Sequence, residues 1–159
     1  MALTWHLNVR FFIPTALHHC SDVYGIELGA GVQMTDELRV DANYTYLTWS
    51  VDSSSVVPGD QVLANTPRHK ANVSVWYRGY QGLDVGVSAR IQEGFDWAAG
   101  IFFGPIPSSQ TVDVTASYQV NPRLRIHGVA TNLLDQRRYQ IYGGSLIGRR
   151  ALGGLTVTF

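Results

Sequence analysis

The sequence has little of several features that usually reveal a fold or an activity. Cys20 is the one cysteine among 159 residues, so an internal disulfide is excluded. Twelve basic and twelve acidic side chains cancel, which leaves no net charge to attract nucleic acid. No apolar run approaches the roughly 18 residues that a transmembrane helix needs. These absences argue against a disulfide-rich domain, a nucleic-acid-binding protein and a helical membrane protein.

Motifs of catalysis and metal binding are also scarce. The sequence has no GxSxG, HExxH or Walker loop, so we expect no enzyme and no cofactor. His18, His19 and Cys20 are three metal donors in a row, but adjacent side chains of an extended segment point in different directions. No second cluster completes such a site, and we therefore expect no metal.

Alternating apolar side chains are the main feature that the sequence does contain. Eight segments of roughly nine to eleven residues have this pattern, which fits tilted strands that cross a bilayer. Between Leu83 and Gln92, every second side chain is apolar, while Asp84 and Arg90 fall on the opposite face. We predict an all-β fold of antiparallel transmembrane strands at residues 1–12, 23–33, 38–48, 70–77, 83–94, 111–118, 124–131 and 151–159.

The connections between these segments alternate in length. Short turns are expected at 34–37, 78–82 and 121–122, and long loops at 50–68, 95–107 and 132–149. This alternation is typical of outer-membrane barrels, with tight periplasmic turns and longer outer loops, and it places both chain ends on the periplasmic side. Aromatic residues near strand ends would form interfacial girdles: Trp5, Phe11, Tyr44, Tyr46, Tyr77, Tyr118 and Phe159.

Alternation alone does not decide whether the apolar face meets lipid or a protein interior. A soluble barrel of the lipocalin or avidin kind therefore stays open, as does a self-standing eight-stranded membrane barrel with a structural or adhesive role. The last side chain, Phe159, continues the apolar face at the chain end. A carboxylate beside a buried Phe would be unfavourable in a soluble core, so this position favours a membrane interface.

The C-terminal region carries a recognisable motif. The run from Ala130 to Tyr139, followed by Gly148, Arg149, Arg150 and an alternating final strand, resembles the end of TonB-dependent outer-membrane receptors. The motif residues are Asn132, Leu133, Asp135, Arg138 and Tyr139. The sequence departs from the family at Leu134, where Phe is usual, and at Val157, where an aromatic is common. An alternative is that Asn132 and Asp135 only shape the exit from a strand by capping backbone groups.

This resemblance implies a larger barrel of roughly 22 strands around a plug domain, to which the chain contributes about eight. Residues 1–159 would then form a single barrel domain without the plug, and the N-terminus lacks a recognisable export signal. We expect a receptor fragment in the outer membrane of a Gram-negative bacterium, which in intact form takes up siderophores or similarly bulky nutrients. The energy-transducing TonB-type protein would be contacted only through the missing plug region.

Two further sets of residues are candidate sites. The aromatic residues Phe95, Trp97, Phe102 and Phe103 lie in an expected outer loop, where they would contact a ligand or pack on one another. The terminal residues Leu155, Val157 and Phe159 are candidates for a signal read by the barrel-assembly machinery through strand pairing, or for a plain anchor in outer-membrane lipid.

Overall fold

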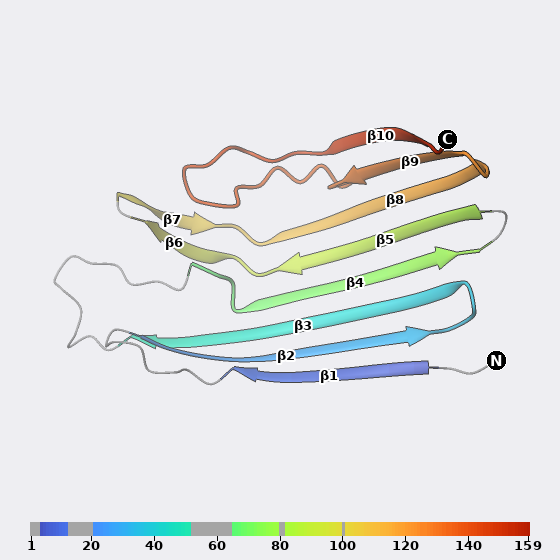
Figure 1. Ribbon diagram of the computed structural model, residues 1–159. Helices are drawn as coiled ribbons and strands as arrows, with labels where there is room; N and C mark the ends of the chain where they lie inside the picture. The colour runs from blue at the N-terminus through green and yellow to red at the C-terminus, as the bar shows by residue number, and fades with distance from the viewer. Residues whose placement is uncertain (1–3, 13–20, 52–64, 80–81, 100) are drawn as a thin grey trace.

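The computed structural model describes residues 4–12, 21–51, 65–79, 82–99 and 101–159. It contains antiparallel strands throughout (Figure 1). The strands are β1 (Thr4–Phe12), β2 (Ser21–Gln33), β3 (Leu38–Val51), β4 (His69–Arg78), β5 (Leu83–Gln92), β6 (Phe95–Ala99), β7 (Phe102–Ile106), β8 (Ser109–Asn121), β9 (Leu124–Thr131) and β10 (Arg150–Val157). The described residues include no helix of the length and apolar character that crossing a membrane requires.

The predicted all-β antiparallel fold is confirmed. Eight strands pair in the order β1-β2-β3-β4-β5-β8-β9-β10, while β6 and β7 form a separate two-stranded sheet. The eight predicted segments correspond to the strands of the larger sheet, and β9 has the predicted bounds. Two strands extend further than the alternation predicted, since β3 continues to Val51 and β8 to Asn121.

The prediction of a loop at 95–107 is wrong. Most of this segment forms the β6–β7 hairpin, in which Trp97 pairs with Gly104 and Asp96 with Pro105. A proline is tolerated here because both strands of a two-stranded ribbon are edge strands, whose free side needs no N–H donor. The hairpin extends the sheet at the end opposite the short turns (Figure 1).

The register aligns apolar side chains across the whole sheet. One cross-strand row begins at Trp5 and ends at Ala151, and every member is apolar: Trp5, Val32, Val40, Val75, Val87, Val114, Ala130 and Ala151. The adjacent row on the opposite face contains Asp41, Ser74, Ser88 and Asp113. A one-residue slip of any strand would place its apolar set on the polar face, so the pattern fixes the register.

The apolar face is the outer face of the sheet. Trp5, Phe11 and Val87 remain 68%, 71% and 39% exposed, and Ile106 is the one large apolar side chain that is fully buried among the described residues. Three hollows lie on the other face, which makes the polar side the concave one. A soluble barrel would enclose its apolar side chains, so this arrangement contradicts the soluble-barrel interpretation.

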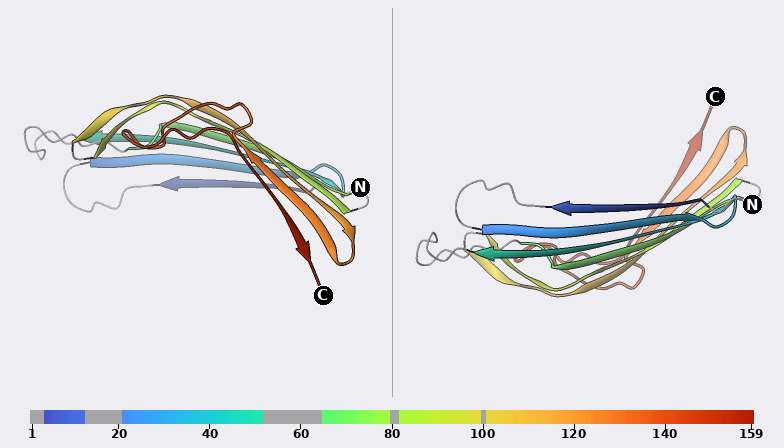
Figure 2. Two further views of the ribbon diagram at one scale, coloured as in Figure 1. Left: turned by 90° about the horizontal axis from the view of Figure 1, so that it is seen from above. Right: turned by 90° about the horizontal axis from the view of Figure 1, so that it is seen from below.

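The sheet is a curved wall and not a closed cylinder (Figure 2). In the described residues β1 and β10 each pair with one neighbour, so each leaves one edge unpaired. The start of β1 and the end of β10 lie at the same end of the sheet as the short turns (Figure 1), as alternating connections require. An unpaired edge cannot persist in hydrocarbon, where backbone groups find no water.

Candidate functional site

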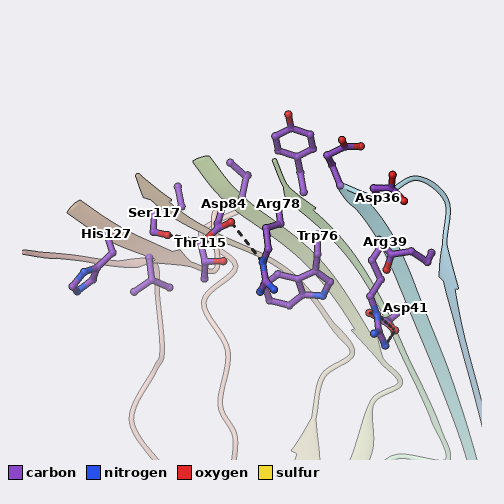
Figure 3. A pocket seen from close by; sticks show the side chains of 17 residues that line it. Asp36, Arg39, Asp41, Trp76, Arg78, Asp84, Thr115, Ser117 and His127 are labelled. Carbon is purple, nitrogen blue, oxygen red and sulfur yellow. Dashed lines mark hydrogen bonds and ion pairs between the residues drawn. The ribbon is translucent and has the colours of Figure 1, made fainter. Parts of the chain in front are cut away.

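The largest hollow occupies the turn end of the polar face, between β3 and β9 (Figure 3). Its volume is about 940 Å³. Trp76 lies across its floor in a space that only glycine leaves free, because a Cβ on Gly86 would be 2.3 Å from the Trp76 ring. Gly86 and Trp76 face each other in the β4–β5 register. An aromatic ring over a strand glycine restores the packing that the glycine lacks.

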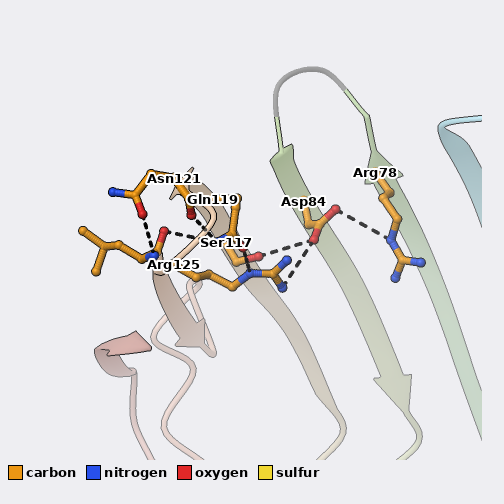
Figure 4. Close-up of polar contacts among 7 residues, drawn as sticks. Arg78, Asp84, Ser117, Gln119, Asn121 and Arg125 are labelled. Atoms are coloured by element: carbon orange, nitrogen blue, oxygen red, sulfur yellow. Dashed lines mark hydrogen bonds and ion pairs between the residues drawn. The ribbon is translucent and has the colours of Figure 1, made fainter. Parts of the chain in front are cut away.

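Paired charges line this hollow. The Asp84 carboxylate lies 3.6 Å from Arg78 Nε and 3.9 Å from Arg125 NH1, and Arg125 Nε donates to Gln119 Oε1 at 2.8 Å (Figure 4). Arg39 donates to Asp41 at 2.7 Å on the opposite side. Each of these arginines is about half or more exposed, so each pair contributes at most about 1 kcal/mol to stability. Asp36 and Glu37 also line the hollow, so carboxylates outnumber arginines in its lining.

A serine, a histidine and an aspartate also meet in this hollow. Ser117 lies opposite Asp84 on β5 and opposite His127 on β9. The Ser117 hydroxyl donates to Asp84 Oδ2 at 3.5 Å, whereas a catalytic triad needs histidine between serine and carboxylate. The serine lies between the aspartate and the histidine, so the three residues form a polar row across the strands and not a nucleophile with its general base.

The motif that follows β9 is organised by Asn132. This residue is 3% exposed and adopts φ of 55°, a left-handed conformation that Asn tolerates better than most residues. Its side chain donates to the Gln136 carbonyl at 2.9 Å and accepts from the Gln136 N–H at 3.1 Å. Asp135, also at positive φ, accepts from the Arg149 N–H at 2.9 Å. These contacts are those of a turn-forming segment.

The same motif is fastened to the sheet. The Asn132 N–H donates to Asp113 Oδ1 at 2.8 Å, and the other Asp113 oxygen pairs with Arg90. The Leu133 N–H continues the ladder by donating to the Val112 carbonyl at 2.8 Å. The loop 132–149 therefore starts from a fixed position above β8.

Further along this loop, Arg138 forms an isolated bridge with Ile147, which brings the two ends of the loop together. Tyr139 follows it and is partly exposed. Of the five motif residues, Asn132 and Asp135 form hydrogen bonds within this loop through their side chains, and Arg138 does so through its backbone. The backbone of Leu133 instead bonds to β8.

The four predicted ligand-contacting aromatics do not converge. Phe95, Trp97 and Phe102 lie on one face of the β6–β7 hairpin, and Phe103 lies on the other. The loop 132–149 covers part of the first face, since the Tyr142 ring occupies the position of a Cβ on Gly104, at 2.1 Å. Packing on neighbouring loop residues accounts for that part, whereas Phe102 on the same face and Phe103 on the other remain 53% and 48% exposed.

Two residues that fix the hairpin were not identified from the sequence. Asn65 exchanges two hydrogen bonds of 2.8 Å with the backbone of Ala98, which ties the hairpin to the segment before β4. Tyr142 packs on Gly104 from the other side. Neither residue belongs to an alternating segment, so the pattern that predicts strands does not single it out. The available signal was residue type, because asparagine often bonds to nearby backbone and tyrosine often packs at contacts between loops.

The other predicted site residues lie at the margins of the structure. Leu155 and Val157 are exposed on the apolar face of the edge strand β10, and Phe159 lies beyond its end and is fully exposed. His18, His19 and Cys20 lie outside the described residues. Within the part of the chain that is described, no group of three His, Cys, Asp or Glu side chains gathers as metal ligands would.

Comparison with known proteins agrees with this geometry. The family model described as TonB dependent receptor-like, beta-barrel, matches residues 21–133. The siderophore receptor PiuA from Acinetobacter baumannii aligns with TM-score 0.67 and 25% identity over 86% of this chain. The pyoverdine outer membrane receptor FpvA from Pseudomonas aeruginosa aligns with TM-score 0.68 and 18% identity over 99%, and the copper transporter OprC with 0.67 and 19% over 87%.

The last two likenesses, below 25% identity, show the fold alone. This chain spans 22%, 27% and 24% of the lengths of PiuA, FpvA and OprC, respectively. A search among curated proteins found no significant match. Because the family model covers well over half of the 159 residues and the sheet has the matching architecture, this chain belongs to the family of TonB-dependent receptor-like β-barrels.

Proposed function

We propose that this chain forms the C-terminal part of the barrel wall of a TonB-dependent receptor in the outer membrane of a Gram-negative bacterium. In intact form the receptor takes up iron siderophore complexes or similarly bulky nutrients. The support is the family match together with the likeness to a siderophore receptor and a copper transporter. The structural observation that carries the proposal is an apolar outer face opposite a hollowed polar face.

The outer face fits a hydrocarbon environment in its details. Tyr77 and Tyr118 lie near the turn end of the sheet, and Tyr44 and Tyr46 lie toward the loop end. Aromatic residues at two levels, with Val and Ala between them, are the pattern of interfacial girdles around an apolar band. Tyr44 also shares a 2.6 Å hydrogen bond with His69 Nδ1, which satisfies two polar groups near the outer girdle.

The partners of the chain follow from this placement. Outer-membrane lipid would cover the apolar face, and the missing remainder of the barrel would pair with the free edges of β1 and β10. The barrel-assembly machinery would read Leu155, Val157 and Phe159 at the β10 edge by strand pairing. The TonB-type protein would act through a plug region, and the β6–β7 hairpin with Phe103 would face an incoming ligand.

Lipid exposure of the apolar face tests the proposal most directly. Spin labels on cysteines introduced at Val87 and Ser88 report neighbouring positions on opposite faces of β5, in an intact receptor reconstituted into vesicles with Cys20 replaced by Ser. We expect the label at position 87 to collide mainly with oxygen, which concentrates in lipid. The label at position 88 should respond mainly to a water-soluble nickel chelate.

The reverse pattern would show that the apolar face is buried in protein and would exclude the receptor wall. Uptake itself is tested by deleting the gene and measuring growth on iron chelates as the sole iron source. We expect slower growth on at least one chelate and recovery with a plasmid copy. Unchanged growth on a broad panel of iron and copper chelates would reject metal uptake while leaving the barrel assignment intact.

A further inference from the structure

A small hollow near the outer end of the polar face has an unusual balance of charge. Its volume is about 220 Å³, and its lining includes the cations Lys70, Arg90 and Arg138 but no aspartate or glutamate. We propose that Lys70 and Arg138 form a binding site for a carboxylate or phosphate group of a molecule that enters from outside. This inference rests on the proposed function, because it assumes that the polar face lines a lumen.

The strand register explains how these side chains meet. Lys70 on β4 lies opposite Gln92 on β5, which in turn lies opposite Ser109 on β8. In the next polar row, Asn72 lies opposite Arg90, and Arg90 opposite Thr111. Arg138 enters the hollow from the loop 132–149, where its bridge to Ile147 fixes the backbone. Residues of β3 line the hollow as well, so four strands and one anchored loop build the site.

The cations differ in whether they already have partners. Arg90 is neutralised by Asp113. The side chains of Lys70 and Arg138, by contrast, make no hydrogen bond or ion pair with any residue that the structure describes. Arg138 Nε is buried, and among the described side chains it is the one such polar atom without a hydrogen-bond partner. A buried donor of a charged group without an acceptor is unfavourable, so the site is incomplete as it stands.

Neutral groups in the same hollow complement the two cations. The hydroxyls of Ser109 and Thr111 and the side-chain amide of Gln92 line it. Hydroxyl and amide groups donate to anionic oxygens, and an arginine offers several donors in a planar arrangement that matches a carboxylate or a phosphate. Both free cations and neutral donors therefore point to an anion and not to a cation or an apolar group.

The position favours an incoming molecule over another part of the receptor. Lys70, Gln92 and Ser109 stand at the ends of β4, β5 and β8 nearest the outer loops. The larger hollow at the turn end has its arginines paired with Asp41 and Asp84 and is also lined by Asp36 and Glu37, so it is less suited to an anion. An anion that approaches from the loop side would meet Lys70 and Arg138 before those pairs.

Calorimetric titration of the intact receptor in detergent tests the site, with citrate and inorganic phosphate as separate probes. Citrate binding alone would indicate a carboxylate site, and phosphate binding alone a phosphate site. For whichever probe binds, we expect the paired change Lys70→Gln and Arg138→Gln to weaken affinity at least about tenfold, since hydrogen bonds to charged groups are strong. The change Arg137→Gln is the matched control, because Arg137 is the adjacent exposed arginine outside the hollow.

Arg138→Lys keeps the positive charge, so we expect this variant to retain affinity. That result would show that the paired substitution acts by removing charge and not by misfolding. Absence of binding by either probe to the unaltered receptor would overturn the anion site, as would equal weakening by Arg137→Gln. The proposed function fails separately, by shielding of position 87 from lipid. A receptor whose apolar face meets lipid but which binds neither probe would reject this inference alone.

Discussion

A charge placed on the apolar face should destabilise the barrel in proportion to its depth. Leu83, Val87 and Ile91 lie on one strand and one face at intervals of four residues, so they sample three depths with the same chemistry. We consider the substitution of each by Arg in turn, in an intact receptor. The matched control is Ser88→Arg, which places the same side chain on the polar face one residue away.

The expected magnitudes follow from strand geometry. Four residues span about 13 Å along a strand at roughly 3.3 Å per residue. A tilt of about 40° reduces this to about 10 Å along the membrane normal, within an apolar band about 25 Å tall. Val87 in mid-strand therefore lies near the midplane, and Leu83 and Ile91 lie near the two interfaces. We expect Val87→Arg to lower the free energy of unfolding by about 2–4 kcal/mol, and each end substitution by about 0–1 kcal/mol.

Equilibrium unfolding by guanidinium in phospholipid vesicles, followed by tryptophan fluorescence, measures these differences. Ser88→Arg should cost less than about 1 kcal/mol, because the polar face meets water. Equal costs at all three depths, or a larger cost for Ser88→Arg than for Val87→Arg, would refute a lipid-facing apolar surface. A large loss of unfolding free energy for Leu83→Arg, with none for Val87→Arg, would instead show that the depth assigned to β5 is wrong.

Three other substitutions test particular contacts. Gly86→Ala should lower stability by about 1–3 kcal/mol and shift Trp76 fluorescence, because the new Cβ meets the ring; Gly128→Ala, whose Cβ would have no neighbour nearer than 3.6 Å, should be nearly neutral. Asn132→Ala should cost about 1–3 kcal/mol and speed protease cleavage within the loop 132–149, because it removes two hydrogen bonds at a positive-φ position. Asp84→Asn should change stability by less than about 1 kcal/mol, since its ion pairs are long and exposed.

Each of these predictions has an outcome that contradicts it. Equal effects of the Gly86 and Gly128 substitutions would show that Trp76 does not occupy the space over Gly86. Unchanged cleavage in Asn132→Ala would show that the turn holds without that side chain. A loss of several kcal/mol in Asp84→Asn would show that the charges of the large hollow lie in a drier environment than the exposed arginines indicate.

The strands were predictable because their signal is local. In β5 each apolar residue is separated from the next by one residue, and a period of two needs no tertiary information. The β6–β7 hairpin was not predictable in this way, because Pro105, Gly104 and adjacent aromatics break the alternation. It is contacted by Asn65 and Tyr142, which approach from loops distant in sequence.

The candidate sites also differ in whether their residues are neighbours in the sequence. The motif around Asn132 and Asp135 is a local turn, so residue type and spacing already indicated its shape. The anion site could not be read from the sequence, because Lys70 and Arg138 are 68 residues apart and their neighbours give no sign of which charges are paired. Only the folded sheet shows that Asp113 neutralises Arg90, whereas the other two cations have no partner among the described residues.

The sequence by itself determined that this protein is built from amphipathic strands with a TonB-dependent receptor motif near the C-terminus, because a side-chain period of two and a turn motif are properties of neighbouring residues. The tertiary structure alone decided which face is concave, since curvature is a property of the paired sheet and not of any one strand. It also decided which charges lack partners, because strand pairing brings together residues that the chain keeps far apart.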